Sequence, residues 1–314
     1  MENLPTLKQL RHLVALAEHR HFGKAAKASF VTQSTLSASL KELEAILGAA
    51  LVDRTRRQVA FTPLGEETVQ RAQRLLEDAE GLAGTARAMQ APLTGTVRLG
   101  VIPTIGPFLL PRILPALRRD YPKLKLYLRE EQTEPLLEQL KAGRLDVLVL
   151  ALPYDVGGAE TAHLFDDPFA VAVRADNRLA KLSKIAPDRI EAETLLLLQD
   201  GHCLRDHALS ACRLGSKPHW DAFEATSLHT LVQMVENGLG ITLLPQLAID
   251  GGILQGTDIL LRPVSGTPPA REIALVWRRG TGRKAEFQLL AKEITRMAAR
   301  DRGGARPEPK AEGT

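Results

Sequence analysis

The stretch FGKAAKASFVTQSTLSASLKELEAIL, residues 22–47, decides the fold of the first part of the chain. Its first seven residues predict a short helix with a face of small side chains, against which another helix can cross closely. A turn over residues 29–31 follows, and the Thr32 hydroxyl can cap the next helix. The apolar positions of that second helix recur at helical spacing and predict a buried face: Leu36, Leu40, Leu43 and Ile46. The pattern predicts a helix–turn–helix.

The outer face of the second helix carries short polar side chains and one lysine: Gln33, Ser34, Thr35, Ser37 and Lys41. Amide and hydroxyl groups at a helix start suit the major groove of DNA, where they meet base edges and phosphates. Gly48 is expected to end the helix. The alternative is an ordinary helix pair with a solvated Ser/Thr face.

A cluster of arginines follows this helix pair: Arg54, Arg56 and Arg57. They lie between Leu51 and the strand-like residues 59–61, which is the pattern of a short hairpin, or wing. The arginines of such a wing contact phosphates or enter the minor groove. The order of these pieces predicts binding to double-stranded DNA.

Bulk composition places limits on the rest of the molecule. The chain has 314 residues, 44% hydrophobic and 25% charged, which suits two or three globular domains. The net charge is only +4, so the positive charge that meets DNA must be local. We see no signal peptide and no apolar run of roughly 18 residues that could span a bilayer. We therefore expect a cytoplasmic protein without membrane contact, whose two cysteines are thiols.

A long helix is predicted over residues 63–90. It opens after Thr62 with Pro63, a residue suited to a first helical turn. Its apolar residues follow a helical stripe that needs a partner: Leu64, Val69, Ala72, Leu75, Leu76, Ala79, Ala83, Ala86 and Met89. We expect a linker helix that dimerises; the alternative is a helix lying on its own domain.

From Gly95 the pattern changes to alternating strands and helices. Strands are predicted at 96–102, 124–130, 145–150, 169–173, 194–198, 241–243 and 272–277, and helices at 107–119 and 135–142. The alternation favours an α/β architecture with largely parallel sheets. The adjacent carboxylates Asp166 and Asp167 are predicted to lie in a surface turn.

The predicted domains are residues 1–62 for DNA binding, 63–90 for the linker helix and 94–300 for a regulatory domain. The regulatory domain is expected to have two subdomains facing across a cleft, one of about 94–166 plus 268–300 and one of about 167–267. A disordered tail is expected over 301–314.

The segment QDGHCLRDHALSAC, residues 199–212, contains both cysteines. Cys203 follows a plausible helix start at Asp200-Gly201 and has His202, Arg205 and His207 as sequence neighbours. Cations and helix N-terminal amides favour the thiolate, which is the reactive form. Peroxide would convert that thiolate to a sulfenic acid, and a second thiol could resolve it to a disulfide.

The spacing of the two cysteines has a structural consequence. If the segment is helical, nine residues place the two alpha carbons about 13.5 Å apart. A disulfide needs roughly 4.4 to 6.8 Å, so its formation would unwind the segment and act as a two-state switch. Two buried, inert cysteines remain an open alternative. A zinc site is disfavoured because the spacing is unusual and no four-ligand set is apparent.

The first 65 residues resemble the winged helix–turn–helix of LysR-type transcriptional regulators. The matching residues are Ala25-Ala26, Thr32-Gln33, Thr35-Leu36-Ser37, Leu43-Glu44, Leu47-Gly48, Leu51-Val52, Arg54 and Phe61-Thr62-Pro63-Leu64-Gly65. Ser34 departs from the pattern, because many members have proline there. The resemblance implies a periplasmic-binding-protein-like regulatory domain of two subdomains and a homo-oligomer, often a tetramer, on paired operator half-sites. RNA polymerase is then an expected partner.

A second resemblance is to the peroxide-responsive members of that family. It is carried by Gly201-His202-Cys203-Leu204-Arg205-Asp206 with Cys212, by His19-Arg20-His21-Phe22, by residues 102–107 and by residues 225–228. It implies that Cys203 is peroxidatic and Cys212 resolving. It also implies a set of residues around peroxide: Thr104, Thr133, His202, Arg205, Asp206 and, as a further guanidinium, Arg271. Alternatively, Thr104 caps the helix after Pro107 and Arg205 is solvated.

The expected function is thus a regulator rather than an enzyme, with hydrogen peroxide as its signal and a glutaredoxin- or thioredoxin-type reductant. We expect no cofactor and no metal. The first alternative is a regulator of the same family that binds a small metabolite in the α/β cleft. A thiol peroxidase is disfavoured because no proline-threonine loop leads into Cys203, and a solute-binding protein because an N-terminal DNA-binding pattern is present.

Overall fold

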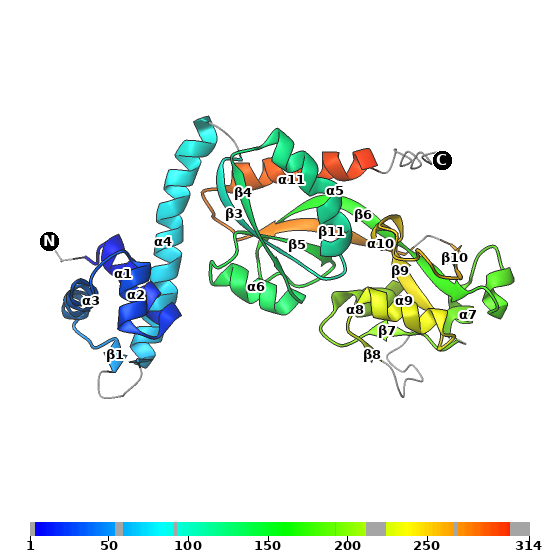
Figure 1. The fold of residues 1–314 in the computed structure, drawn as a ribbon, viewed down its shortest axis with the longest axis horizontal. Helices are drawn as coiled ribbons and strands as arrows, with labels where there is room; N and C mark the ends of the chain where they lie inside the picture. The colour runs from blue at the N-terminus through cyan, green and yellow to red at the C-terminus, as the bar shows by residue number, and fades with distance from the viewer. Residues whose placement is uncertain are drawn as a thin grey trace, which may run out of the picture. The chain divides into compact units, whose positions relative to one another are not determined.

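The computed structural model describes residues 4–53, 59–90, 93–191, 193–211, 224–266 and 269–301 (Figure 1). The chain forms two compact units, which are Met1–Gln90 with the short segments Lys141–Arg144 and Thr281–Arg283, and the remainder. Several predicted features lie outside the described residues: Arg54, Arg56, Arg57, Cys212 and the tail from residue 302. No helix in the described ranges is long and apolar enough to cross a membrane.

The first unit is a winged helix–turn–helix followed by a long helix. Its elements are α1 (Leu7–His19), α2 (Phe22–Ala28), α3 (Gln33–Leu47), the antiparallel pair β1 (Val52–Asp53) and β2 (Ala60–Phe61), and α4 (Pro63–Gln90). Leu36, Leu40 and Leu43 of α3 are buried, as their spacing predicts. They pack in one core with residues of α1, α2 and α4.

The ends of these helices follow the predicted local chemistry. The Thr32 hydroxyl accepts from the Thr35 amide at 3.2 Å, and Gly48 ends α3 in the left-handed conformation. The Thr62 hydroxyl accepts from the Gly65 amide at 3.0 Å in the first turn of α4. One cap was not predicted: the His21 ring accepts from the Gly23 amide at 3.0 Å and starts α2.

The second unit is built on a seven-stranded sheet. The order is β10-β6-β11-β5-β3-β4, with β9 also paired to β6. The strands are β3 (Gly95–Val101), β4 (Leu124–Glu130), β5 (Val147–Leu152), β6 (Glu160–Arg174), β9 (Thr242–Pro245), β10 (Ile259–Pro263) and β11 (Ala270–Trp277). The predicted strand 169–173 is therefore the second half of the longer strand β6.

The expectation of largely parallel sheets is wrong. In the described part of the seven-stranded sheet, β3 runs parallel to β4 and β5, whereas β11 is antiparallel to both β5 and β6, and β9 and β10 are antiparallel to β6. The physical reason is that β11, which comes from far along the chain, inserts between β5 and β6 and runs antiparallel to both. The strands β5 and β6 run in the same direction but are not neighbours, so the short connection over residues 153–159 does not join an adjacent parallel pair.

Strand β6 serves two groups of strands in turn. Its first half, up to Pro168, pairs with β11, and its second half, from Phe169, pairs with β9 and β10. Asp166 and Asp167 lie within this strand, so the predicted surface turn is wrong. The Asp167 side chain is fully buried at the point where β6 changes partners.

Helices cover this framework. They are α5 (Gly106–Asp120), α6 (Thr133–Lys141), the 3₁₀ helix η1 (Arg178–Lys181), α7 (Pro187–Glu191), α8 (Cys203–Ala211), α9 (Leu228–Glu236), α10 (Gln246–Asp250) and α11 (Lys284–Asp301). The predicted strand 194–198 shortens to β7 (Leu197–Leu198), which pairs with β8 (Glu224–Ala225) in parallel. Helix α8 packs against β7 and β11.

Substituting Gly65 by alanine is expected to destabilise the first unit. A Cβ atom at Gly65 would lie 2.1 Å from the carbonyl oxygen of Leu51, so the backbone would have to shift. Alanine favours a helix by about 1 kcal/mol over glycine. Overpacking costs about 1–3 kcal/mol, and we expect the upper end because the clash is with backbone, so the net loss is about 2 kcal/mol. Urea unfolding of the full chain measures the loss. Exposed Glu66→Ala should change stability by less than about 0.5 kcal/mol; equal effects would contradict the steric explanation.

Candidate functional site

Cys203 is the first residue of helix α8 and is buried, with 4% of its surface exposed. The residue two before it, Gly201, has a φ of +92°, a conformation that L side chains rarely adopt. A Cβ at Gly201 would also press against the side chain of Gln132. Residues 203–211 are helical, which is the condition under which the sequence predicts that Cys203 and Cys212 lie too far apart for a disulfide.

The expected activation of Cys203 by sequence neighbours is not found. Burial raises the pKa of the Cys203 thiol and is the largest effect on it. The Arg271 guanidinium and the Thr133 hydroxyl act in the opposite direction, and the Asp206 carboxylate adds to the rise. Desolvation outweighs the nearby cation because removing a thiolate from water is costly.

Arg271 of β11 has a fully buried guanidinium, which makes hydrogen bonds to Asp167 and Thr104. Its Nε donates to Asp167 Oδ2 at 3.0 Å, and a second nitrogen lies 3.0 Å from the same oxygen. The remaining contacts reach Thr104, whose hydroxyl accepts at 2.8 Å and whose carbonyl accepts at 3.0 Å. Asp167 Oδ1 also accepts from the Leu247 amide at 2.8 Å. This network joins β11, β6, the loop after β3 and α10.

The two predicted threonines have different environments. Thr104 is held by Arg271 and does not cap α5, because the cap position is Ile105 without a side-chain hydrogen bond. Thr133 begins α6 and is 1% exposed. Its hydroxyl lies close enough to Cys203 to favour the thiolate, yet it makes no hydrogen bond of good geometry to the described residues. A buried, unpartnered hydroxyl beside a sulfur atom suits a small polar ligand.

Three predicted residues lie close to Cys203 in sequence: His202, Arg205 and Asp206. None of them is among the main groups that lower the pKa of the Cys203 thiol. Arg205 donates to the Leu198 carbonyl at 3.3 Å and pairs with Asp200 at 3.0 Å. Residues two apart on a helix do not face each other, which explains why the guanidinium that acts on Cys203 comes from distant Arg271. Asp206 is exposed, whereas His202 is buried and its pKa is lowered by that burial.

Two residues of this centre were missed as site residues. Asp167 was assigned to a surface turn, and no local pattern reveals that it pairs with Arg271, 104 residues away. His207 was treated only as a sequence neighbour of Cys203. Its Nε2 lies 3.0 Å from the Pro153 carbonyl oxygen, and its Nδ1 is buried without a partner among the described residues. The sequence did contain one signal for His207: it lies four residues after Cys203, and residues four apart on a helix share one face.

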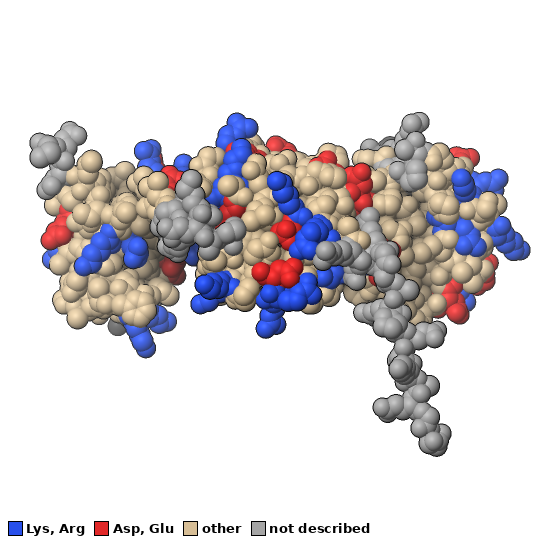
Figure 2. Space-filling model, turned by 90° about the horizontal axis from the view of Figure 1, so that it is seen from above, with Lys and Arg blue, Asp and Glu red and all other residues tan. Residues whose placement is uncertain are grey.

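The predicted DNA-contacting residues of α3 are accessible. Gln33, Ser34, Thr35 and Lys41 are exposed and Ser37 is half-buried. The preceding turn holds Phe30, which is 96% exposed at a φ of +54°. On the face drawn in Figure 2, lysine and arginine side chains alternate with acidic ones, in keeping with the small net charge.

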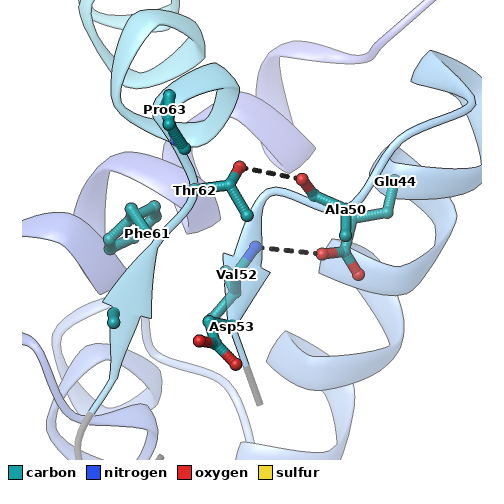
Figure 3. A pocket seen from close by; sticks show the side chains of 8 residues that line it. Glu44, Ala50, Val52, Asp53, Phe61, Thr62 and Pro63 are labelled. Atoms are coloured by element: carbon teal, nitrogen blue, oxygen red, sulfur yellow. Dashed lines mark hydrogen bonds between the residues drawn. The ribbon is translucent and has the colours of Figure 1, made fainter. Parts of the chain in front are cut away.

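The wing is fixed to both helices beside it. The Glu44 carboxylate of α3 accepts from the amides of Leu51 and Val52, at 2.9 and 3.2 Å. The Thr62 hydroxyl donates to the Ala50 carbonyl at 2.9 Å. Figure 3 shows both anchors at an open pocket between the strands and the end of α3. The hairpin is thereby held against α3 and the start of α4.

A winged helix–turn–helix followed by a mixed α/β domain is the architecture of a class of bacterial regulators, and the chain matches two family models of that class. Residues 7–66 match the bacterial regulatory helix-turn-helix protein model of the lysR family, and residues 90–299 match the LysR substrate binding domain model. The chain belongs to the LysR family, whose members are DNA-binding transcriptional regulators and not enzymes.

Individual relatives cover almost the whole chain. The HTH-type transcriptional regulator EstR of Acinetobacter baylyi is 44% identical, over 95% of this chain and 99% of its own. A hydrogen peroxide-inducible genes activator of Dickeya chrysanthemi is 40% identical, over 92% and 94%. A full-length OxyR variant from Pseudomonas aeruginosa is similar in structure, with a TM-score of 0.79, 37% identity and coverage of 98% and 100%.

The ionisation of Cys203 gives a direct test of this site. In a Cys212→Ser protein, the single thiol should titrate above the ordinary value for cysteine, because burial raises its pKa. Adding Arg271→Gln should move the titration further up, since it removes the cation that opposes desolvation. Alkylation rates measured against pH report both values. A Cys203 that titrates below an exposed cysteine would contradict the described environment.

Proposed function

We propose that the protein is a peroxide-responsive DNA-binding regulator in which oxidation of Cys203 is the signal. The observation that carries the proposal is the buried thiol of Cys203 beside the Arg271 guanidinium and the Thr133 hydroxyl, which makes no hydrogen bond of good geometry to the described residues. A relative named as a hydrogen peroxide-inducible genes activator is 40% identical to this chain over 92% of its length. The remaining predicted residues around peroxide are Thr104, His202, Arg205 and Asp206.

The proposed chemistry balances with peroxide as the only oxidant. The Cys203 thiolate attacks one peroxide oxygen, forming an S–O bond and breaking the O–O bond. Hydroxide leaves and takes up a proton as water, while Cys203 becomes a sulfenic acid. The Cys212 thiolate then attacks that sulfur to form the disulfide, and a second water leaves. Arg271 stabilises negative charge that develops on the leaving oxygen, and a thiolate of raised pKa is the stronger nucleophile once formed.

The disulfide step requires α8 to unwind. Eight helical rises separate the alpha carbons of Cys203 and Ala211 by about 12 Å. Cys212 is bonded to Ala211, and consecutive alpha carbons are about 3.8 Å apart. An intact α8 therefore keeps the two cysteine alpha carbons at least about 8 Å apart, beyond the roughly 6.8 Å limit of a disulfide. In the proposal, the two states of the switch are a reduced protein with an intact α8 and an oxidised protein with the disulfide and an unwound α8.

The output of the switch is a change in DNA contacts. We propose a homo-oligomer, a tetramer formed through α4 and the regulatory domains, in which unwinding of α8 changes the spacing of the DNA-binding units on paired half-sites. The domain boundaries at 62, 90 and 300, with subdomains meeting near 167 and 267, belong to this proposal. So do RNA polymerase as a partner, a glutaredoxin- or thioredoxin-type reductant and a cytoplasmic location.

A second candidate is a regulator that responds to a small metabolite. The similarity to EstR, 44% over nearly the full length, favours it, because that relative is not named for peroxide. In this case Cys203 would be a structural cysteine and the effector would bind elsewhere in the α/β domain. The two candidates share the fold and the DNA-binding unit, so they differ only in what Cys203 does.

Substituting Cys203 by serine distinguishes the two candidates. The variant keeps the size of the side chain but cannot form a sulfenic acid, so promoter output should no longer respond to low doses of peroxide. A reporter gene under the bound promoter gives the measurement, and a Cys212→Ser protein tests the resolving step separately. An unchanged peroxide response in the Cys203→Ser protein would falsify the redox proposal and favour the metabolite-responsive regulator.

Gln33→Ala is expected to relax base preference. Gln33 is exposed at the first turn of α3, where an amide contacts base edges in the major groove. Its loss should cost about 1–3 kcal/mol of discrimination at one base pair. Lys41→Ala should instead weaken binding to all sequences and reduce the salt dependence. Binding assays on operator and scrambled DNA measure both; full selectivity in the Gln33→Ala protein would remove that residue from base reading.

A further inference from the structure

His207 lies one helical turn after Cys203 on α8 and connects that helix to the central sheet. Its Nε2 is 3.0 Å from the carbonyl oxygen of Pro153, the residue that follows β5. A carbonyl oxygen only accepts, so Nε2 carries the hydrogen and Nδ1 of the neutral ring carries a lone pair. The side chain is 8% exposed. The helix that holds Cys203 is thus bonded, through a buried side chain, to the end of a neighbouring strand.

The surroundings of the ring are those of the redox centre. Arg271 of β11 and Asp206 of α8 act electrostatically on both His207 and Cys203. Tyr154, next to Pro153, is close enough to Cys203 and Asp206 to be affected by their charges. The other nitrogen, Nδ1, has no hydrogen-bond partner among the described residues. Residues four apart on a helix share one face, so Cys203 and His207 move together when α8 moves.

We propose that His207 is a positioning residue of the redox site, whose hydrogen bond to the Pro153 carbonyl holds α8 against the end of β5 and must break before α8 can unwind. The bond keeps Cys203 next to Thr133 and Arg271 while the protein is reduced. This inference rests on the proposed function, since it assigns His207 control over the step from sulfenic acid to disulfide. Arg205 of α8 donates instead to the Leu198 carbonyl of β7.

The ring also makes this contact sensitive to pH. Burial lowers the pKa of His207 from its ordinary value of 6.5, and the charge of Arg271 acts in the same direction, while the Pro153 carbonyl and Asp206 oppose them. Protonation would place a donor at the unpartnered Nδ1 and a second positive charge near Arg271. Because the folded-state pKa is lowered, the stabilisation is present above pH 6.5 and declines as the pH falls below it.

Hydrogen exchange of the α8 amides in the reduced full-length protein tests the contact without any oxidant. His207→Gln keeps an amide donor for the Pro153 carbonyl, whereas His207→Met has a similar length and no donor. The methionine variant should exchange about tenfold faster than the glutamine variant, because a buried carbonyl is left unpaired. Equal exchange in the two variants would overturn the inference.

The pH dependence adds a readout that a purely structural role would not give. In the parent protein, the opening of α8, corrected for intrinsic exchange, should increase between about pH 7.5 and about pH 5.5. His207→Gln should show a clearly smaller increase, whose remainder comes from His202, because burial lowers the pKa of that residue as well. The parent protein alone provides this test if the methionine variant does not fold. A pH-independent opening, or the same dependence in the glutamine variant, would overturn the inference.

A redox measurement then separates this inference from the proposed function. After stoichiometric peroxide, mass spectrometry follows the sulfenic acid and the disulfide over time. His207→Met should close the disulfide about tenfold faster than His207→Gln, with similar rates of sulfenic acid formation. Equal closing rates in proteins that do form the disulfide would contradict the role of His207. Absence of any disulfide in the parent protein would instead contradict the proposed function, and the exchange data would still decide the contact.

Discussion

The buried ion pair between Arg271 and Asp167 is the interaction on which the second unit depends. Both side chains are fully buried, and placing two charges in the interior is costly unless hydrogen bonds satisfy them. Here Thr104 and the Leu247 amide complete the set. Removing one partner would leave an uncompensated charge at a cost of about 3–5 kcal/mol. The pair lies where β6 passes from pairing with β11 to pairing with β9 and β10, so it holds these strands together. The same pair fixes the position of the Arg271 guanidinium that acts on Cys203.

The position of this ion pair next to Cys203 explains why two opposite effects act on the pKa of the Cys203 thiol. The packing that buries Arg271 also buries Cys203, and burial opposes the thiolate that the guanidinium favours. The pKa of the Cys203 thiol is therefore governed by burial and by groups of β11 and α6 more than by the cations next to it in sequence.

Local sequence patterns predicted the first unit well because its structure is local. The leucines of α3, the caps at Thr32 and Thr62 and the stop at Gly48 each act within a few residues. The second unit was less predictable, since β11 inserts between β5 and β6 from far along the chain. Arg271 was suggested by family resemblance alone, and its pairing with Asp167 depends on that insertion. The polarity of Asp166-Asp167 favoured a turn because no pattern shows a charge partner 104 residues away.

The wing contacts the start of α4 at two points: the Thr62 hydroxyl donates to the Ala50 carbonyl, and Gly65 lies against the Leu51 carbonyl. Glu44 adds a bond from the wing to α3. These contacts leave little freedom between the hairpin, α3 and the long helix. A substitution that shifts the start of α4 is therefore expected to disturb the wing and α3 as well, because the three segments are bonded to one another.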